Sequence, residues 1–365
     1  MDFTYSEEQE MLREGARRFL ADKSPLDRVR EIVETTDGYD AELWGAIGEQ
    51  GWTAMHIPEH YGGAGFSYAE TAILLHEMGR VLAPVPFLSS LLAAEAILAG
   101  GDDAQKAEWL PKLASGEIIG TVAVAEPAGD WDEASVAVAA SRDGDGFSLT
   151  GTKSFVTAGH VADLLVVAAR LEGEVALFLV GGDAVSATKL VTLDTTRSQA
   201  TVELAGAAAV RLGAAGWDVV ERVYRVAGTA LSSEQVGGLE RTLEMAVEYA
   251  KDRKQFGRAI GSFQAIKHLC ADMLVSLESA RSASGYAVWA LATGSEELAV
   301  AAPLAKAYCS EAYFKSAGDN IQIHGGIGFT WEHDAHLYFK RAKSTELLFG
   351  SPQRQRRELA DRVGI

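Results

Sequence analysis

The stretch LLVVAARLEGEVALFLV, residues 164–180, decides the fold class of this chain. Two apolar runs, 164–169 and 175–180, flank the turn residues Glu172-Gly173-Glu174, a pattern typical of two strands joined by a hairpin. Three further runs of this kind occupy residues 121–125, 135–139 and 200–204. Turn sequences and no helical segments separate these runs, so the region is predicted to form an antiparallel sheet or barrel and not a doubly wound sheet.

Both flanking regions have helical patterns. Residues 6–9 form a Ser-Glu-Glu-Gln capping box ahead of apolar residues at helical spacing, and a further helix is predicted over 68–80. The helical period returns at about residue 216, with helices predicted over 240–254, 299–320 and 333–343. The fold class is therefore α+β and mainly α, with a helical domain at 1–120, a central β domain at 121–215 and a helical domain at 216–365.

The amino-acid composition and net charge exclude some classes of function. The chain has 365 residues, with 33 basic and 51 acidic side chains and a net charge of −18. Such a surface repels polyphosphate backbones, so we expect no nucleic-acid partner. Two cysteines, Cys270 and Cys309, are too few for a disulfide framework, and the acidic N-terminus lacks an apolar signal region. We expect a cytoplasmic protein without a membrane segment.

Several familiar motifs are rejected. The glycine clusters at 62–65, 257–261 and 325–328 do not join a strand to a helix, so neither a dinucleotide fingerprint nor a P-loop is predicted. His333 and His336 have ligand chemistry at i, i+3 spacing, but no further ligands have fitting spacing, and we expect no metal site. There is no Gly-x-Ser-x-Gly nucleophile elbow.

The strongest chemical signal is Arg253-Lys-Gln-Phe256-Gly257, which stands seven residues before Gln264. Arginine forms forked hydrogen bonds with phosphate, and phenylalanine packs on flat heterocycles. Taken alone, the segment also fits a solvated basic helix end that is capped by glycine.

Five segments make the chain resemble the acyl-CoA dehydrogenases over essentially its whole length. They are PEHYGGAG (58–65), AEP (125–127), GTKSFVT (151–157), RKQFG (253–257) and QIHGGIGF (322–329), in the family's order and spacing. The resemblance implies an N-terminal helical domain, a central β-barrel domain and a C-terminal four-helix bundle. It also implies a tetramer with FAD at a dimer interface, where one subunit holds the flavin ring and its neighbour contacts the pyrophosphate and adenosine.

The resemblance implies removal of two hydrogens from an acyl-CoA, with electrons passing to an electron-transfer flavoprotein or a similar acceptor. A glutamate takes the α-proton while a hydride leaves the β-carbon for the flavin. One family position for this base falls on Phe349, and the other falls on Ala227, followed by Gly228 in place of an arginine. We therefore predict no catalytic base in this chain.

The residues expected at the flavin ring also depart from the family pattern. In contrast, the residues expected to contact the cofactor of a neighbouring subunit are all present. The family's usual threonine, serine and tryptophan are replaced by Ala125, Trp131 and Phe155, although Thr157 keeps its hydroxyl. The residues that the resemblance assigns to the neighbour's cofactor are Arg253, Phe256, Gln264, Gln322, Gly325 and Gly326.

Three hypotheses follow. The leading one is a base-lacking subunit of a heterotetramer that completes the FAD site of a base-carrying partner, as in bacterial heteromeric acyl-CoA dehydrogenases, some of which act on sterol side-chain thioesters. The second is a self-sufficient homotetramer whose base is a shifted acid, Glu221 or Glu234. The third is a flavin-free scaffold subunit.

Overall fold

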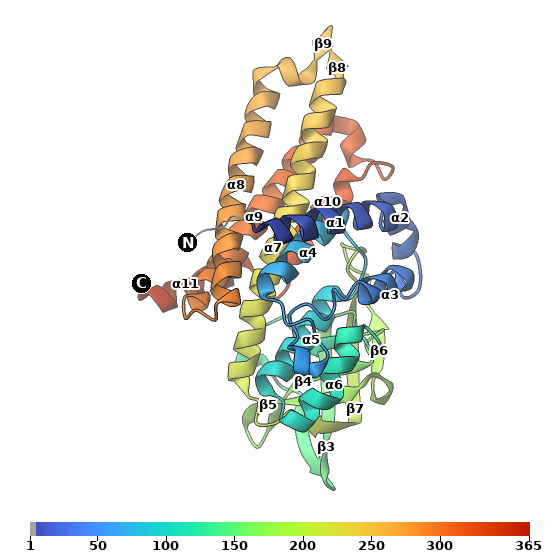
Figure 1. Cartoon of the computed structure of the whole chain (residues 1–365), viewed down its shortest axis with the longest axis vertical. Coiled ribbons are helices and arrows are strands. Elements are labelled where there is room, and N and C mark those ends of the chain that lie inside the picture. The colour runs from blue at the N-terminus through green and yellow to red at the C-terminus, as the bar shows by residue number, and fades with distance from the viewer. Residues whose placement is uncertain (1–4) are drawn as a thin grey trace. The chain divides into compact units, whose positions relative to one another are not determined.

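The computed structural model describes residues 5–365, in which helices are followed by strands and then by helices (Figure 1). The first helices are α1 (Glu7–Lys23), α2 (Leu26–Val33), α3 (Ala41–Glu49), α4 (Tyr68–Val81), α5 (Phe87–Gly100) and α6 (Asp103–Ser115). The strands are β1 (Gly120–Ala123), β2 (Ala139–Asp143), β3 (Gly146–Thr157), β4 (Leu164–Leu171), β5 (Glu174–Gly181), β6 (Ser186–Lys189) and β7 (Gln199–Arg211). The last helices are α7 (Trp217–Asp252), α8 (Gln264–Ala292), α9 (Leu298–His324), α10 (Ala335–Leu347) and α11 (Pro352–Val363), with the short strands β8 (Lys254–Gln255) and β9 (Arg258–Ala259) between α7 and α8. The predicted fold class is confirmed.

The chain divides into two compact units. The first contains the described residues up to Arg30, Ala72–Ala83 and Gly228–Ile365, and the second contains Glu31–Thr71 and Pro84–Ala227. Among the described helices, none combines the length and the apolar character that a membrane-spanning segment needs.

The first unit is built from helices around an apolar core. The core includes Leu239, Leu277, Tyr313 and Tyr338, each at most 2% exposed. The capping box predicted at the start of α1 is confirmed, since the Gln9 amide N–H donates to the Ser6 side chain and the Ser6 amide N–H donates to the Gln9 side chain.

Two glycines let α4 and α7 approach each other closely within this unit. A Cβ on Gly79 would lie 2.1 Å from the carbonyl oxygen of Glu234, and one on Gly237 would lie 1.9 Å from that of His76. Because neither carbonyl can move without unwinding a helix, any side chain at these positions would separate α4 from α7.

The second unit contains a closed β-barrel. The strands pair in the order β4-β2-β3-β7-β5, and β5 pairs again with β4, which closes the ring. β1 adds to β4, and β6 adds to β7. The pairings of β1 and β2 with β4 are parallel and the others are antiparallel, so the barrel is predominantly antiparallel. The hairpin predicted from residues 164–180 is confirmed as β4 and β5.

The strand predicted over residues 135–139 is wrong for most of its length. Ser135 ends a short 3₁₀ helix, and β2 begins only at Ala139. The physical reason lies in Glu126, whose Oε1 accepts hydrogen bonds from the backbone N–H groups of Ala137 (2.7 Å) and Val138 (2.9 Å). Those donors are therefore not available to a neighbouring strand.

Candidate functional site

A strained hairpin stands between α7 and α8 in the first unit. Gln255 pairs with Arg258, and the two residues between them, Phe256 and Gly257, have φ of 53° and 78°. Two consecutive positive φ angles are typical of a type I′ turn, whose first position favours Asn, Asp or Gly. A phenylalanine there is unusual, and its side chain is 93% exposed. The turn therefore presents an aromatic ring to the solvent at a cost in backbone strain.

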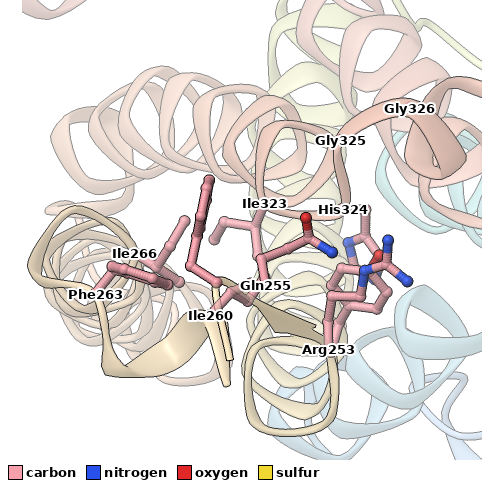
Figure 2. A pocket seen from close by; sticks show the side chains of 11 residues that line it. Arg253, Gln255, Ile260, Phe263, Ile266, Ile323, His324, Gly325 and Gly326 are labelled. Carbon is pink, nitrogen blue, oxygen red and sulfur yellow. The ribbon is translucent and has the colours of Figure 1, made fainter. Parts of the chain in front are cut away.

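A pocket of about 400 Å³ lies beside this hairpin (Figure 2). Its lining residues are Tyr249, Arg253, Gln255, Phe256, Ile260, Phe263, Ile266, Ile323, His324, Gly325 and Gly326. Figure 2 shows Arg253 and His324 at one end and the apolar side chains of Phe263 and Ile266 at the other. The pocket thus has a cationic end and an apolar end, which suits a ligand with an anionic and an aromatic part.

Four of the six residues assigned to the neighbour's cofactor meet at this pocket. Arg253, Phe256, Gly325 and Gly326 all line it, although they come from two segments about 70 positions apart in the sequence. A Cβ on Gly325 or Gly326 would have no heavy atom within 4 Å, so the two glycines leave open space beside their backbone.

The other two assigned residues do not line the pocket. Gln264 begins α8, where its Nε2 lies 3.5 Å from Nε2 of His268, and Gln322 is exposed on the last turn of α9. Their roles stay predictions.

Tyr249 and His324 are among the pocket-lining residues that the sequence analysis did not assign. The rings of Tyr249 and His324 are stacked with centroids 4.3 Å apart. The ring of His333 also packs against His324, with centroids 4.4 Å apart. Nδ1 of His324 lies 2.8 Å from the carbonyl oxygen of Asn320, which assigns the proton to Nδ1. Burial lowers the pKa of His324, so its ring is neutral near pH 7. Tyr249 could have been found from its place one helical turn before Arg253.

His333 and His336 do not share a helix face, because α10 begins only at Ala335. Nδ1 of His333 accepts a hydrogen bond from the amide N–H of Ala335, and Nε2 of His336 lies 3.3 Å from the carbonyl oxygen of Trp331. Within residues 5–365, no group of three or more His, Cys, Asp or Glu side chains could hold a metal ion.

In the second unit, a buried ion pair joins two of the sequence motifs. Nζ of Lys153, in the 151–157 segment, lies 2.8 Å from Oε1 of Glu126 and also donates to the carbonyl oxygen of Val124. Burial lowers the pKa of Lys153 to about 8. For Glu126, burial raises the pKa, but the hydrogen bonds from Lys153 and from the backbone of Val138 and Ala137 outweigh it and lower the pKa. Glu126 is thus held as a structural carboxylate.

The 151–157 segment also contains a buried hydroxyl group that lacks a hydrogen-bond partner among the described residues. Thr157 is 8% exposed, and its Oγ1 is buried without a hydrogen-bond partner in the described part of the chain. Phe155, two residues earlier, has φ of 57° and is 38% exposed. Buried hydroxyl groups are nearly always hydrogen-bonded, so an unpaired one indicates that a group outside the chain completes it.

Phe349, at the first predicted base position, is held rigidly just after α10. Its φ is 57° and its side chain is 5% exposed. Gln355 Nε2 donates to its carbonyl oxygen at 3.1 Å. The buried Lys306 ammonium donates to the carbonyl oxygens of Thr345 (2.7 Å) and Glu346 (3.1 Å), which anchors the end of α10.

The second base position lies inside α7, where Ala227 is fully buried and Gly228 has no side chain. The two shifted acids of the alternative hypothesis are both in ion pairs. Glu221 is 2.9 Å from Arg225, and Glu234 is 2.8 Å from Arg341 in a pair whose side chains are 6% and 3% exposed.

Glu95 is a buried carboxylate that was not anticipated from the sequence. Glu95 in α5 is 1% exposed, and it accepts hydrogen bonds from the Tyr68 hydroxyl on Oε2 and from Nε of Arg222, 2.5 Å away, on Oε1. Burial raises the pKa of Glu95 despite the opposing charge of Arg222. Both oxygens are engaged, so Glu95 is also occupied as a structural group.

Two family models match separate parts of the chain. Residues 6–117 match the family model described as Acyl-CoA dehydrogenase, N-terminal domain, and residues 214–364 match Acyl-CoA dehydrogenase, C-terminal domain. The chain is 37% identical over 359 residues to Acyl-CoA dehydrogenase IpdE2 of Mycolicibacterium smegmatis, which covers 98% of this chain and 99% of that protein.

Two solved structures of heteromeric relatives superpose over nearly the whole chain. A chain of the ChsE4-ChsE5 complex from Mycobacterium tuberculosis has a TM-score of 0.91 at 32% identity, with 100% of this chain and 99% of that chain covered. A chain of the Tcur3481-Tcur3483 steroid ACAD has a TM-score of 0.90 at 31% identity, with 98% of each chain covered.

Proposed function

The chain belongs to the acyl-CoA dehydrogenase family of oxidoreductases, and from this premise we propose that it is the base-lacking subunit of a heteromeric, FAD-dependent acyl-CoA dehydrogenase. It completes the cofactor site of a partner subunit and relies on that partner for proton abstraction. Membership of the family implies flavin use, while the division of labour is inferred from this chain's own residues.

One observation carries the proposal: the base positions hold no acid, but the pocket for the neighbour's cofactor keeps its charge and shape. Phe349 is a buried hydrocarbon side chain, and Ala227 is another. An α-proton of a thioester is so weakly acidic that its removal needs a positioned base. The two shifted candidates, Glu221 and Glu234, are each engaged in an ion pair, with Arg225 and Arg341 respectively.

The residues present fit the adenosine-pyrophosphate end of FAD. The Arg253 guanidinium would fork onto the pyrophosphate, and the exposed ring of Phe256 would pack on a flat heterocycle. The open space at Gly325 and Gly326 lets backbone amides approach phosphate oxygens, as a Cβ would not. Gln264 and Gln322 are proposed as further polar contacts, reached when the partner subunit docks.

The flavin-ring side of this chain fits less well. The unpaired Thr157 hydroxyl supports a hydrogen bond to a bound ring, but Ala125 offers no hydroxyl. Trp131 packs edge-on against Tyr224, with ring centroids 6.1 Å apart, where the family has a small serine. We therefore assign the productive ring site to the partner subunit.

This assignment gives each group of residues a separate task. When bound, FAD accepts the hydride that leaves the β-carbon. This chain would hold the cofactor through Arg253 and Phe256, whereas its buried Phe349 side chain has no proton-accepting atom. The α-proton must then pass to a carboxylate of the partner.

The assembly and substrate class rest on the heteromeric relatives. Resemblance to chains of the ChsE4-ChsE5 complex and of a steroid ACAD supports a heterotetramer that oxidises a steroid-derived acyl-CoA. We also propose that the chain has a helical domain at residues 1–120, a β domain at 121–215 and a helical domain at 216–365.

The test is to purify the chain by a tag from its native host, identify what co-purifies, and count flavins per assembly. We expect a second acyl-CoA dehydrogenase polypeptide with a glutamate at one of the two base positions, together with bound flavin. A complex without flavin absorbance would favour the scaffold hypothesis, and a flavin-loaded homotetramer of this chain would contradict the proposal.

A further inference from the structure

The side chain of His324 is held in one orientation in the wall of the pocket beside the hairpin. His324 is the last residue of α9 and is 6% exposed. Its ring stacks on that of Tyr249 in α7, with centroids 4.3 Å and planes 28° apart, and it also packs against His333. Its Nδ1 lies 2.8 Å from the carbonyl oxygen of Asn320, one helical turn earlier. Two ring contacts and one hydrogen bond therefore fix both the position and the rotation of the imidazole.

These contacts also determine the hydrogen-bonding character of the second ring nitrogen, Nε2. A carbonyl oxygen only accepts hydrogen bonds, so Nδ1 must carry the proton that it donates to Asn320. Burial lowers the pKa of His324, and the neighbouring His333 lowers it further, although the hydrogen bond to Asn320 raises it. The ring therefore carries a single proton near pH 7, and Nε2 is an acceptor. No group within residues 5–365 donates a hydrogen bond to it.

Nε2 differs in this respect from the guanidinium group of Arg253, which Figure 2 shows at the same end of the pocket. Arginine has N–H donors and no acceptor, so Arg253 attracts ionised oxygens. An ionised phosphate oxygen has no proton to donate to Nε2. Gln255 also offers an acceptor oxygen, but its side chain is exposed and is held by one hydrogen bond, from its Nε2 to the carbonyl oxygen of Lys254. Arg253 and His324 together suit a ligand that has a hydroxyl or amino donor close to its anionic group.

The apolar end of the pocket indicates where the flat ring of a nucleotide lies. Phe263 and Ile266 line that end, away from Arg253 and His324 (Figure 2). The ring of Phe263 also contacts that of Phe256, edge-on at 6.1 Å between centroids, so two aromatic rings are available to a heterocycle there. In an adenine nucleotide the sugar joins the base to the phosphates, and the amino group is on the far edge of the base. With the phosphates at Arg253 and the base at the apolar end, the donor nearest His324 is a sugar hydroxyl.

We propose that Nε2 of His324 accepts a hydrogen bond from a ribose hydroxyl of the adenosine part of the cofactor and so positions the sugar. This assignment rests on the proposed function, which places the adenosine-pyrophosphate end of FAD in this pocket. The two residues then have complementary tasks, since Arg253 binds the charge of the phosphates and His324 distinguishes a nucleotide from a phosphate compound without a sugar.

The test measures the binding of ADP to the flavin-free assembly by calorimetric titration. Two variants separate the two ring nitrogens, because the amide nitrogen of Asn replaces Nδ1 and the end of a Gln side chain reaches the position of Nε2. His324→Asn keeps a donor for the carbonyl oxygen of Asn320 but removes the acceptor, so it should bind ADP about tenfold more weakly than the wild type. The matched control His324→Gln supplies an acceptor oxygen in place of Nε2 and should stay within about threefold of the wild type. Inorganic pyrophosphate should bind equally to all three proteins.

Analogues of ADP test the same hydrogen bond on the wild type, which needs no variant to fold. Deoxyadenosine diphosphate and cordycepin diphosphate each lack one sugar hydroxyl, whereas purine riboside diphosphate lacks the amino group of adenine. We expect one of the two sugar analogues to bind the wild type about tenfold more weakly than ADP. The same analogue should bind His324→Asn as ADP does, because the two changes remove one and the same hydrogen bond.

The outcomes distinguish this inference from the proposed function. Equal binding of ADP by the wild type and His324→Asn, or equal binding of ADP and both sugar analogues by the wild type, would overturn the role of His324 and leave the cofactor pocket in place. A loss with purine riboside diphosphate that disappears in His324→Asn would assign the donor to the amino group and refute the sugar contact. No binding of ADP by the wild type, or unchanged binding in Arg253→Gln, would contradict the proposed cofactor pocket and overturn this inference with it.

Discussion

Replacing Phe256 with Asn should stabilise the lone chain and weaken its hold on the cofactor. An ordinary residue in the left-handed region costs roughly 1–2 kcal/mol, whereas Asn tolerates it. The phenyl ring is 93% exposed, so little burial is lost within the chain. Its edge contact with Phe263, at 6.1 Å between centroids, is worth about 0.5 kcal/mol at an exposed site. The net effect is a gain of about 0.5–1.5 kcal/mol in the free energy of unfolding.

The opposite sign is expected for the cofactor. Burying a phenylalanine side chain against a partner contributes about 1.5–3 kcal/mol, so its loss should raise the dissociation constant of FAD by about 10- to 100-fold in the assembly. Urea unfolding of the lone chain and FAD titration of the apo assembly measure the two effects. Phe256→Tyr is the matched control, because it keeps both the ring and the strain, and its FAD affinity should stay near that of the wild type. An Asn variant with reduced stability or unchanged FAD affinity would refute the argument.

Three further predictions follow from the site and its surroundings. Gly326→Ala should not lower stability, because its Cβ would meet no atom within 4 Å, but it should reduce the flavin content of the assembly. The control Gly15→Ala also adds a Cβ that meets no atom, and because Gly15 lies inside α1 it should raise stability by roughly 0.5–1 kcal/mol and leave the flavin content unchanged. Equal flavin content in both variants would exclude the Gly326 backbone from the cofactor site. Burial lowers the pKa of His56 to about 4, so the unfolded chain binds a proton before the folded chain does as pH falls below about 6.5. The free energy of unfolding should therefore decline between pH 6.5 and 4 by up to about 3 kcal/mol. Denaturation at pH 7.5 and 4.5 should show a smaller decline for His56→Phe than for the wild type, and an equal decline would contradict this. Arg341→Met should lower the free energy of unfolding by about 3–5 kcal/mol, because it leaves the buried Glu234 carboxylate without its ion-pair partner. Glu234→Gln should change turnover of the assembly by less than about twofold. Abolished turnover in Glu234→Gln would identify that residue as the base.

The local features of the fold were predictable, because their determinants are close in sequence. The capping box at Ser6 and the hairpin of β4 and β5 depend on neighbouring residues alone. The parallel pairing of β1 with β4 depends on segments about 40 residues apart, and no short-range pattern encodes it. The start of β2 was misplaced because one side chain, Glu126, withdraws two backbone donors from it.

The residues of the candidate site were likewise predictable only where short-range sequence identifies them. Arg253 and Gly326 were identified because each lies in a motif of its own. His324 lies within the second motif, but its stacking on Tyr249 joins two helices that are distant in sequence. The buried ion pair of Glu234 with Arg341 was equally hidden, because its two partners are 107 residues apart in the sequence.

The central claim is that this chain has no group to accept the α-proton. Acyl-CoA-dependent dye reduction by the purified chain, with FAD supplied, tests it most directly beside the same assay on the intact assembly. We predict that the assembly turns over and that the chain alone does not exceed the rate without substrate. Steady turnover by the chain alone would contradict the account.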